Sequence, residues 1–291
     1  MNEHDAFVSL DRDDILQTII RLALAEDVGA GDWTTRWTVP AGAKGVARIV
    51  AKTPLVVSGS TVTSAVFHAV DPQLKVNVLR ADAEAAGAEQ GVMEIGGSLR
   101  SILTAERVAL NFLGRLSGIA TLTREFVRTV EGTRARIVDT GKTTPGWRLF
   151  EKDAVRHGGG MNHRFGLHDM ILIKDNHVAA CGGVLEALEA VEQRNEKGLA
   201  VEIEVGSMRD LDKVLKNPPD RILLDNMSVR DMGEAVHRVR GLGSRRPELE
   251  ASGNVTLATV AAIAATGVDL ISVGALTHSA PVADLSLRLG E

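Results

Sequence analysis

Residues 201–226, VEIEVGSMRDLDKVLKNPPDRILLDN, hold two short apolar runs that each end in a carboxylate, with a helix-like segment between them. Glu204 ends the first run and Asp225 ends the second. Such alternation is typical of β/α units, which build a parallel sheet. In (β/α) barrel enzymes the active site lies at the carboxyl ends of the strands. The stretch therefore predicts a fold class and the edge of the sheet at which catalytic residues should lie.

The same pattern repeats after Arg136, where six apolar runs are separated by helix-like segments. The four other runs lead to Asp139, Lys174, Ser252 and Gly274. A complete barrel has eight strands. We therefore expect an α/β fold with an incomplete (β/α) barrel over residues 119–278 and a site at its rim.

The chain before residue 119 follows a different pattern. Residues 11–26 carry apolar side chains at helical spacing, with two aspartates in the first turn, where the helix dipole stabilises acidic groups. Further on, a helix-like segment at 61–70 lies among β-like runs at 45–51, 55–57, 74–79 and 92–95. This mixture predicts a small α+β domain.

A longer helix is expected over residues 101–119, because apolar side chains there recur with the period of an α-helix. Its opposite face carries small and polar residues, which are more often exposed than packed. We place the end of the α+β domain at residue 118, so that it spans 1–118, and we expect a helical C-terminal segment over 279–291.

Composition excludes several classes of protein. The chain has 291 residues and 44% hydrophobic residues, enough for one large domain or two modest ones. Aromatic residues make up only 3% and the net charge is −5, which disfavours nucleic-acid binding. Cys181 is the only cysteine, so neither an intrachain disulfide nor a cysteine zinc cluster is possible. With neither a signal peptide nor an apolar stretch that would span a bilayer, we expect a cytoplasmic protein without membrane contacts.

The segment Asp139–Gly146, DTGKTTPG, is the densest group of candidate functional residues. It follows a strand-like run and contains two glycines, three threonines and Lys142. Such a loop offers backbone N–H groups and an ammonium group to an anion. The spacing is not that of a P-loop. An ordinary turn with a solvated lysine remains an alternative.

Two further segments carry cations. Three glycines in the stretch 158–164 permit unusual backbone conformations, and His163 and Arg164 follow them as hydrogen-bond donors. A surface His-Arg pair is the alternative here. Lys174 follows an Ile-Leu-Ile run, where we expect it to be half-buried, and a buried lysine is costly unless it is paired. A Schiff-base lysine of a lyase is one role that fits this position.

Glu202 and Glu204 alternate with apolar residues, so both carboxylates should point to the same side of their strand. We expect that side to face the barrel interior. Glu204 and Asp225 end neighbouring strands and together suit Mg²⁺, which prefers oxygen ligands. A structural salt bridge to Lys142 or Lys174 is the alternative.

The last two strands end in glycine-containing loops, 252–254 and 274–275. Loops after the last strands of such barrels often bind phosphate through backbone N–H groups. Turn glycines without a ligand are the alternative. Taken together, cations, two carboxylates and two phosphate-type loops at one rim indicate a small, multiply anionic substrate that binds with Mg²⁺.

The chain resembles the quinolinate phosphoribosyltransferase family over nearly its whole length. The resemblance rests on an ordered set of motifs: Thr104–Arg107 with Asn111, Arg115–Gly118 with Ala120 and Thr121, Thr143–Gly146, Gly158–Arg164, Ile173–His177, Glu202–Glu204, Leu223–Asn226 and Glu250–Gly253.

The resemblance implies a reaction and an assembly. The family joins quinolinate to 5-phosphoribosyl-1-pyrophosphate and releases pyrophosphate and CO₂, which gives nicotinate mononucleotide for NAD synthesis. Its members combine an N-terminal α+β sandwich domain with an incomplete α/β barrel. They act as homodimers or as larger assemblies of dimers, in which the N-terminal domain of one subunit covers the barrel mouth of the other.

The resemblance also implies roles for individual residues. Arg107 matches an arginine that reaches the partner's site, and His163, Arg164 and Lys174 match residues that hold the quinolinate carboxylates. Glu204 and Asp225 match the pair that serves the ribose hydroxyls and Mg²⁺. The catalytic residues implied are Lys142, Lys174, Glu204 and Asp225. The other substrate contacts implied are Thr140 and Gly141 in the first loop and Ser252, Gly253, Asn254, Ser272, Val273 and Gly274 around the 5′-phosphate.

One position departs from the family pattern. Gly141 stands where the family has an arginine that donates to a substrate carboxylate. Loss of such a charge-assisted contact weakens binding by about 1.5–3 kcal/mol. Either Arg148 or Arg156 substitutes for it, or the acceptor differs.

Three alternative functions therefore stay open. One is a related transferase of the molybdate-transport-associated type with another acceptor, which the missing arginine favours. The second is a Schiff-base lyase that uses Lys174. The third is a non-catalytic protein that binds the phosphoribosyl donor.

Overall fold

Residues 11–243 and 246–290 of the chain are described by a computed structural model, in which they form two compact units. The first unit comprises the chain up to Thr121 together with two later segments, Thr144–His157 and the residues from Pro281 onward. The second unit comprises Leu122–Thr143 and Gly158–Ala280. No described helix is both long enough and apolar enough to cross a membrane.

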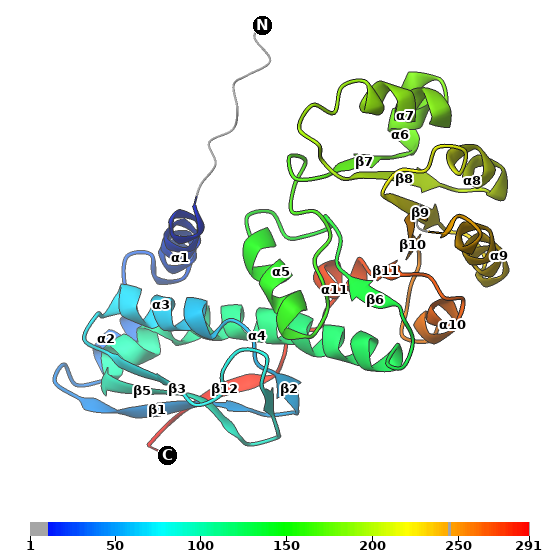
Figure 1. The fold of residues 1–291 in the computed structure, drawn as a ribbon. Helices are drawn as coiled ribbons and strands as arrows, with labels where there is room; N and C mark the ends of the chain where they lie inside the picture. Colours follow the sequence, from blue (N-terminus) through cyan, green and yellow to red (C-terminus); the bar gives the residue numbers. More distant parts are fainter. Residues whose placement is uncertain (1–10, 244–245, 291) are drawn as a thin grey trace, which may run out of the picture. The chain divides into compact units, whose positions relative to one another are not determined.

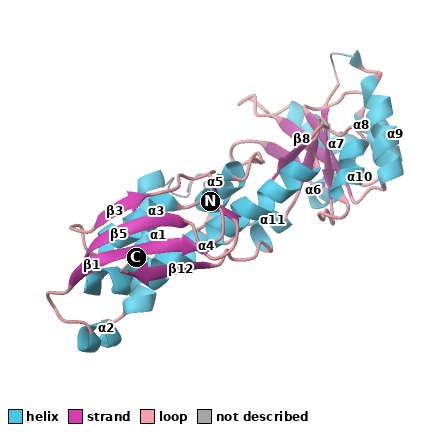
Figure 2. Cartoon of the chain, turned by 90° about the horizontal axis from the view of Figure 1, so that it is seen from below, coloured by secondary structure: helices cyan, strands magenta, loops and turns pink. Residues whose placement is uncertain are grey.

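The first unit is built on an antiparallel sheet of four strands in the order β12-β1-β5-β3. The strands are β1 (Lys44–Ala51), β3 (Lys75–Val78), β5 (Gly91–Ser98) and β12 (Leu285–Leu289). A short pair, β2 (Leu55–Val56) and β4 (Ala85–Ala86), lies beside it. Helix α3 (Ser60–Val70) and the first part of α4 (Leu99–Thr129) lie over one face of this sheet (Figures 1 and 2). The unit also contains α1 (Arg12–Val28), which packs on α3, together with α2 (Trp33–Thr38) and α5 (Arg148–His157).

Local sequence explains where these helices begin and end. The Asp11 side chain caps α1 by accepting from the backbone N–H of Asp14, and Gly29 ends the helix with a positive φ. The apolar face that predicted the long helix is buried in α4, including Ile102, Phe112 and Leu116. The helix ends at Thr129, ten residues after the end at residue 119 that the apolar spacing predicted.

The expectation of a helical C-terminal segment is wrong. Residues 285–289 form strand β12, which pairs antiparallel with β1. Their sequence, LSLRL, alternates apolar and polar residues, which is the period of a strand. The segment thus completes the sheet of the first unit, and residues 144–157 also belong to that unit.

The small residues on the second face of α4 are packed, not exposed. The backbone N–H of Ala283 donates to the carbonyl of Gly114, at 2.9 Å. A Cβ atom on Gly118 would lie 1.9 Å from the carbonyl oxygen of Pro281. Glycine at these positions lets the C-terminal segment cross the helix at close range.

The second unit holds a six-stranded parallel sheet in the order β6-β11-β10-β9-β8-β7. The strands are β6 (Arg136–Val138), β7 (Ile171–Ile173), β8 (Val201–Val205), β9 (Arg221–Asp225), β10 (Glu248–Ser252) and β11 (Leu270–Ser272). Among the described residues, β6 and β7 are not paired with each other, so the sheet does not close. The incomplete barrel and all six expected strands are confirmed.

Helices connect the strands and lie on the outer face of the curved sheet (Figure 1). They are α6 (Asp175–Cys181), α7 (Val184–Glu192), α8 (Met208–Val214), α9 (Val229–Arg240) and α10 (Val260–Ala265). A short helix, α11 (Ala275–His278), follows the last strand of the sheet, β11. Ile203, Leu224 and Ala251 are completely buried. The positions that alternate with them carry Glu202, Arg221 and Glu250, which contact one another. As expected for Glu202, charged side chains occupy the inner face.

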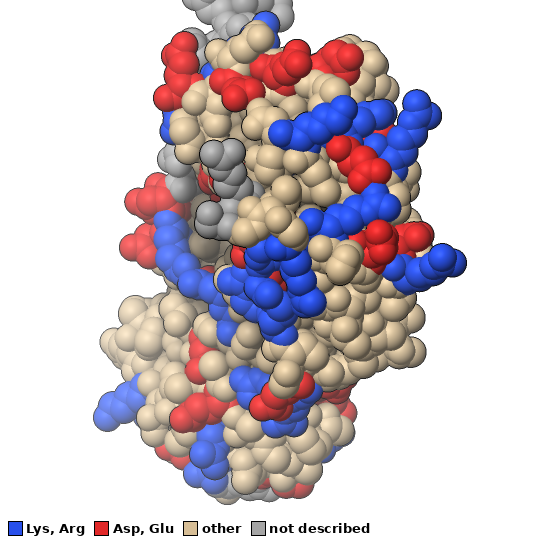
Figure 3. All heavy atoms as spheres, turned by 45° about the vertical axis from the view of Figure 1, so that its right-hand side comes forward, with Lys and Arg blue, Asp and Glu red and all other residues tan. Residues whose placement is uncertain are grey.

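Figure 3 shows both signs of charge on one face of the molecule, with a group of Lys and Arg side chains gathered near the middle of the view.

Candidate active site

The register of the parallel sheet brings the carboxyl ends of its strands to one edge. Asp225 lies opposite Ser252, and Val138 lies opposite Ser272. The loops after β6, β9, β10 and β11 therefore start at the same level. The predicted functional residues in these loops therefore come directly after the same edge of the sheet.

Glu204 and Asp225 are neighbours at this edge, as predicted. Partial burial, the nearby charges of Asp225 and Asp175, and a hydrogen bond shared with Asp225 raise the pKa of Glu204, against the opposing charge of Lys174. Two half-buried carboxylates that repel each other accommodate a divalent cation well, because the cation removes the repulsion. The residues present thus fit Mg²⁺.

Lys142 lies in the loop after β6, and two hydroxyl groups fix its backbone. Thr277 donates to the carbonyl of Lys142 at 2.8 Å, and the hydroxyl of Thr140 accepts from its N–H at 3.1 Å. A Cβ atom on Gly274 would lie 3.3 Å from Cδ of Lys142 and 3.1 Å from Nε2 of His278. The lysine stem therefore runs past the start of α11.

The loop after β10 approaches the loop after β9 closely. The backbone N–H of Asn226 donates to the carbonyl of Ser252 at 2.9 Å. Gly253 has a φ of +98°, and a Cβ atom there would lie 2.2 Å from Oδ1 of Asn226. Asn254 donates to the same oxygen at 3.1 Å. Glycine is therefore required at position 253 by both conformation and space.

The loop after β11 is less accessible than expected. Ser272 is 5% exposed and its hydroxyl donates inward to the carbonyl of Ala251, at 3.3 Å. Val273 is 1% exposed. Of the three residues predicted to bind phosphate here, Gly274 is the one that is partly exposed.

The segment that carries His163 and Arg164 runs alongside β6. Met161 forms a parallel bridge with Val138. The buried carboxylate of Asp139 accepts from the side chain of Asn162 at 2.6 Å and from the backbone N–H of His163 at 2.9 Å. Asp139 therefore determines the path of this segment. The sequence patterns did not predict this role for Asp139.

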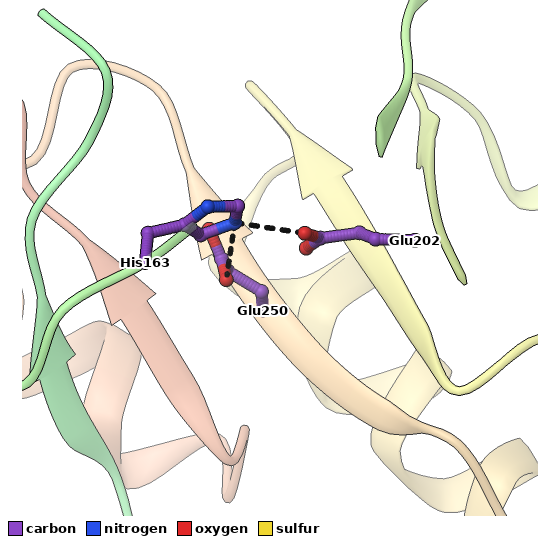
Figure 4. A group of neighbouring side chains, drawn as sticks. All are labelled: His163, Glu202 and Glu250. Atoms are coloured by element: carbon purple, nitrogen blue, oxygen red, sulfur yellow. Dashed lines mark hydrogen bonds and ion pairs between the residues drawn. The ribbon is translucent and has the colours of Figure 1, made fainter. Parts of the chain in front are cut away.

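His163 is buried, with 8% of its surface exposed, and both ring nitrogens have protein partners. Nε2 donates to Oε2 of Glu202 at 2.8 Å and lies 3.6 Å from Oε2 of Glu250 (Figure 4). Nδ1 accepts from the backbone N–H of Arg164 at 2.8 Å. The His-Arg pair is thus not surface decoration. Arg164 itself is half-buried and donates to the carbonyl of Met170 at 3.1 Å.

Charge and burial shift the titration of this cluster. Burial raises the pKa of Glu250 to about 7, with a further contribution from the charge of Glu202. Burial alone lowers the pKa of His163, but the hydrogen bond to Glu202 and the charges of Glu250 and Glu202 outweigh it, so the pKa is raised. Sequence reasoning did not identify Glu250 as an inward residue. The alternation Glu248-Leu249-Glu250 carried the same signal that Glu202-Ile203-Glu204 did.

The remaining predicted residues are exposed. Lys174 is exposed at the end of β7, so the expectation of half-burial is wrong. Arg107 is exposed on α4 of the first unit. Gly141 is also exposed and has no positive φ, and a Cβ atom added there would meet no other atom within 4 Å. Nothing in the local backbone requires glycine at this position. Arg156, one proposed substitute for the missing arginine, pairs with Asp153 in the first unit.

Comparison with known proteins identifies the same family as the sequence motifs. The family model of the quinolinate phosphoribosyl transferase N-terminal domain matches residues 32–117, and that of the C-terminal domain matches residues 119–288. A nicotinate-nucleotide pyrophosphorylase (carboxylating) of Mycobacterium leprae is 44% identical over 279 residues, which cover 95% of this chain and 98% of that protein. A probable enzyme of the same name from Synechocystis is 42% identical over 266 residues, or 91% of this chain and 90% of that one.

Solved structures give the same result. The nicotinate-nucleotide pyrophosphorylase from Francisella tularensis superimposes with a TM-score of 0.90 at 37% identity, covering 97% of this chain and 98% of that one. The two family models together span most of the chain, and both relatives exceed 40% identity over nearly their full lengths. The chain therefore belongs to the quinolinate phosphoribosyltransferase family.

Proposed function

We propose that this protein transfers the phosphoribosyl group of 5-phosphoribosyl-1-pyrophosphate to quinolinate, with loss of CO₂, and so makes nicotinate mononucleotide for NAD synthesis. One observation carries the proposal. In the second unit, Lys174, Glu204 and Asp225 gather at the same edge as the loops of Lys142, Gly253 and Gly274. The edge offers cations and backbone N–H groups to phosphates and carboxylates to ribose hydroxyls.

The chemistry needs positioning and charge more than a protein nucleophile. The pyridine nitrogen of quinolinate attacks C1 of the ribose as the bond to pyrophosphate breaks, through a centre with oxocarbenium character. Glu204 and Asp225 hold the ribose in line for this attack. Lys142 stabilises the negative charge that develops on the leaving pyrophosphate. The positively charged ring nitrogen then stabilises the carbanion that forms as CO₂ leaves, and this carbanion takes up a proton.

We also propose that Mg²⁺ is required and that Glu204 and Asp225 hold it, partly through water. Mg²⁺ held there would supply positive charge that stabilises the leaving pyrophosphate. The support for this is the raised pKa of Glu204 beside Asp225, which marks a place where a cation is favoured.

A homodimer is proposed in addition, with Arg107 of one subunit reaching the site of the other. Its support is the exposed position of Arg107 on α4, a helix whose apolar face and small residues are both packed. A cytoplasmic location stays a prediction from the sequence.

The alternative functions have less support. A Schiff-base lysine is activated by removal from water, whereas Lys174 is exposed. The relatives named above are nicotinate-nucleotide pyrophosphorylases, not transferases of another acceptor.

Mass spectrometry of the products tests the proposal directly. The purified protein is incubated with quinolinate, the phosphoribosyl donor and Mg²⁺, beside a Glu204→Gln control. We expect nicotinate mononucleotide, pyrophosphate and CO₂ in equal amounts from the unaltered protein and a strong reduction from the control. A phosphoribosyl product without decarboxylation, or hydrolysis of the donor alone, contradicts the proposal.

A further inference from the structure

A column of alternating charges runs from the exposed starts of β6 and β10 into the buried interior of the second unit. Glu248 pairs with Arg136 and, at 3.0 Å, with Arg221. The guanidinium of Arg221 lies 3.4 Å from Glu250 and 4.0 Å from Glu202. Both glutamates then face Nε2 of His163, so the column ends at the segment that leads to the rim. Barrels of this type usually fill this space with branched apolar side chains.

Stability does not explain the column. The side chains of Glu202 and Glu250 are 0% and 1% exposed, and one oxygen of each has no hydrogen-bond partner among the described residues. Removal of charges from water costs more than their mutual attraction returns in many proteins, and apolar replacements are often as stable. A buried network that carries this cost is expected to serve another purpose.

The buried end of this column holds His163, which is fixed at three of its groups. The His163 ring is held at Nε2 by Glu202 and Glu250 and at Nδ1 by the backbone of Arg164, and the His163 backbone is held by Asp139. Neither ring nitrogen is directed to solvent in this arrangement. The next side chain along the chain is that of Arg164, a half-buried cation that donates to the carbonyl of Met170.

We propose that His163 is a positioning residue and not a ligand of the acceptor, and that Glu202 and Glu250 fix its ring so that Arg164 is correctly placed for a carboxylate of quinolinate. The inference rests on the proposed function, since it names the group that positions the acceptor. It replaces the direct contact that the family resemblance implied for His163.

A metal ion at the same three side chains is a weaker explanation. Their ligand atoms lie within 4.8 Å of one another. However, the 2.8 Å separation of Nε2 and the Glu202 oxygen is already that of a hydrogen bond, and Arg221 supplies a positive charge beside both carboxylates. The geometry fits a hydrogen-bonded framework.

The kinetic test compares four variants by their separate KM values for quinolinate and for the phosphoribosyl donor. Glu202→Gln and Glu250→Gln keep the shape of the framework and remove its charge, and His163→Asn removes the ring. Glu248→Gln is the matched control, because it makes the same change at the far end of the column. Circular dichroism and urea unfolding establish that each variant folds.

We expect Glu202→Gln and Glu250→Gln to raise the KM for quinolinate about 5–10-fold, because a neutral hydrogen bond replaces a charge-assisted one, with little change in the KM for the donor. The control should leave both values unchanged. The double variant His163→Asn with Glu202→Gln should be no worse than His163→Asn alone, because both changes disrupt the same unit. If His163→Asn alone raises the KM while both glutamine variants match the unaltered enzyme, the proposal is overturned.

Nitrogen-15 NMR of histidine-labelled protein tests the contact itself, with the His163 signals assigned from His163→Asn. In the ligand-free protein, Glu202→Gln should shift the Nε2 signal, whether or not the enzyme is active. Saturation with quinolinate should leave both ring signals of the unaltered enzyme in place. A large shift on quinolinate addition means direct contact and refutes the positioning role. Failure of the proposed function is recognised separately, because the unaltered enzyme then forms no nicotinate mononucleotide.

Discussion

The two sheets differ in the side chains that lie against them, although each unit also buries groups of the other kind, such as Glu151 in the first unit and Ile203 in the second. The first unit packs large apolar side chains between its sheet and helices, and the completely buried ones include Phe67, Met93 and Ile95. The second unit places the charged or polar side chains of His163, Glu202, Arg221 and Glu250 inside its sheet. An apolar core stabilises the fold, because the burial of apolar surface is the main source of folding free energy. The charged interior sacrifices some stability to hold polar groups beneath a site, so the two units should respond differently to substitution.

The largest effect on stability is expected in the first unit. Phe67→Ala leaves a cavity where a completely buried aromatic ring was, and should destabilise the protein by about 3–5 kcal/mol. Urea unfolding followed by circular dichroism measures this. A loss below about 1 kcal/mol, less than typical for a large core side chain, would show that the first unit is not an apolar scaffold.

The largest effect on activity is expected at the rim of the second unit. Lys142→Ala should reduce kcat by about 10²–10³-fold, as for removal of one group that stabilises developing charge. Stability should change by no more than about 0.5 kcal/mol, because the side chain is exposed. Steady-state kinetics with both substrates saturating measures the first value. Near-normal kcat would remove Lys142 from the site.

The charged interior should make stability depend on pH. The pKa of Glu250 is about 7 in the folded protein, above the usual range of an unfolded glutamate, so folding favours the protonated form. The contribution of Glu250 to the free energy of unfolding is therefore fully present below the pKa of the unfolded state. It is lost as pH rises through about 7. The raised pKa of His163 acts in the same direction.

Glu250→Gln cannot titrate, so it should lessen the fall in stability between about pH 5 and 8 by about 1–3 kcal/mol. Urea unfolding at several pH values, with Glu248→Gln as the comparison, measures the difference. Parallel stability curves for the unaltered protein and Glu250→Gln would contradict the assignment of the shift to Glu250.

A smaller effect distinguishes two glycines. Gly118→Ala places a methyl group against the carbonyl of Pro281 and should cost about 1–3 kcal/mol, whereas Gly141→Ala enters open space and should change stability by about 0.5 kcal/mol or less. Thermal unfolding of the pair measures both. Equal melting temperatures would mean that the C-terminal segment does not pack closely on α4.

Most of the second unit could be predicted from sequence because its signals are local. Each strand is a short apolar run, and the residues that follow it, such as Glu204 and Asp225, lie at the edge where parallel strands end. Period-two alternation placed Glu202 and Glu204 on the same side. Glu248, Leu249 and Glu250 alternate in the same way, so the inward direction of Glu250 was also predictable. Only the strand itself is predicted at this place.

What could not be predicted depends on contacts between distant residues. The partner of His163 is Glu202, 39 residues away, and nothing in either local pattern identifies the pair. Strand β12 is five residues long and takes its stability from pairing with β1, more than 200 residues earlier. The glycines at 114 and 118 indicate close packing only once the segment that crosses them is known.

A crystal structure with quinolinate and a non-reactive analogue of the phosphoribosyl donor tests the central claim most directly. We predict the ribose hydroxyls at Glu204 and Asp225, the 5′-phosphate at Gly253 and Gly274, and Arg164 but not His163 at a quinolinate carboxylate. Ligands bound away from the carboxyl ends of these strands would contradict the account.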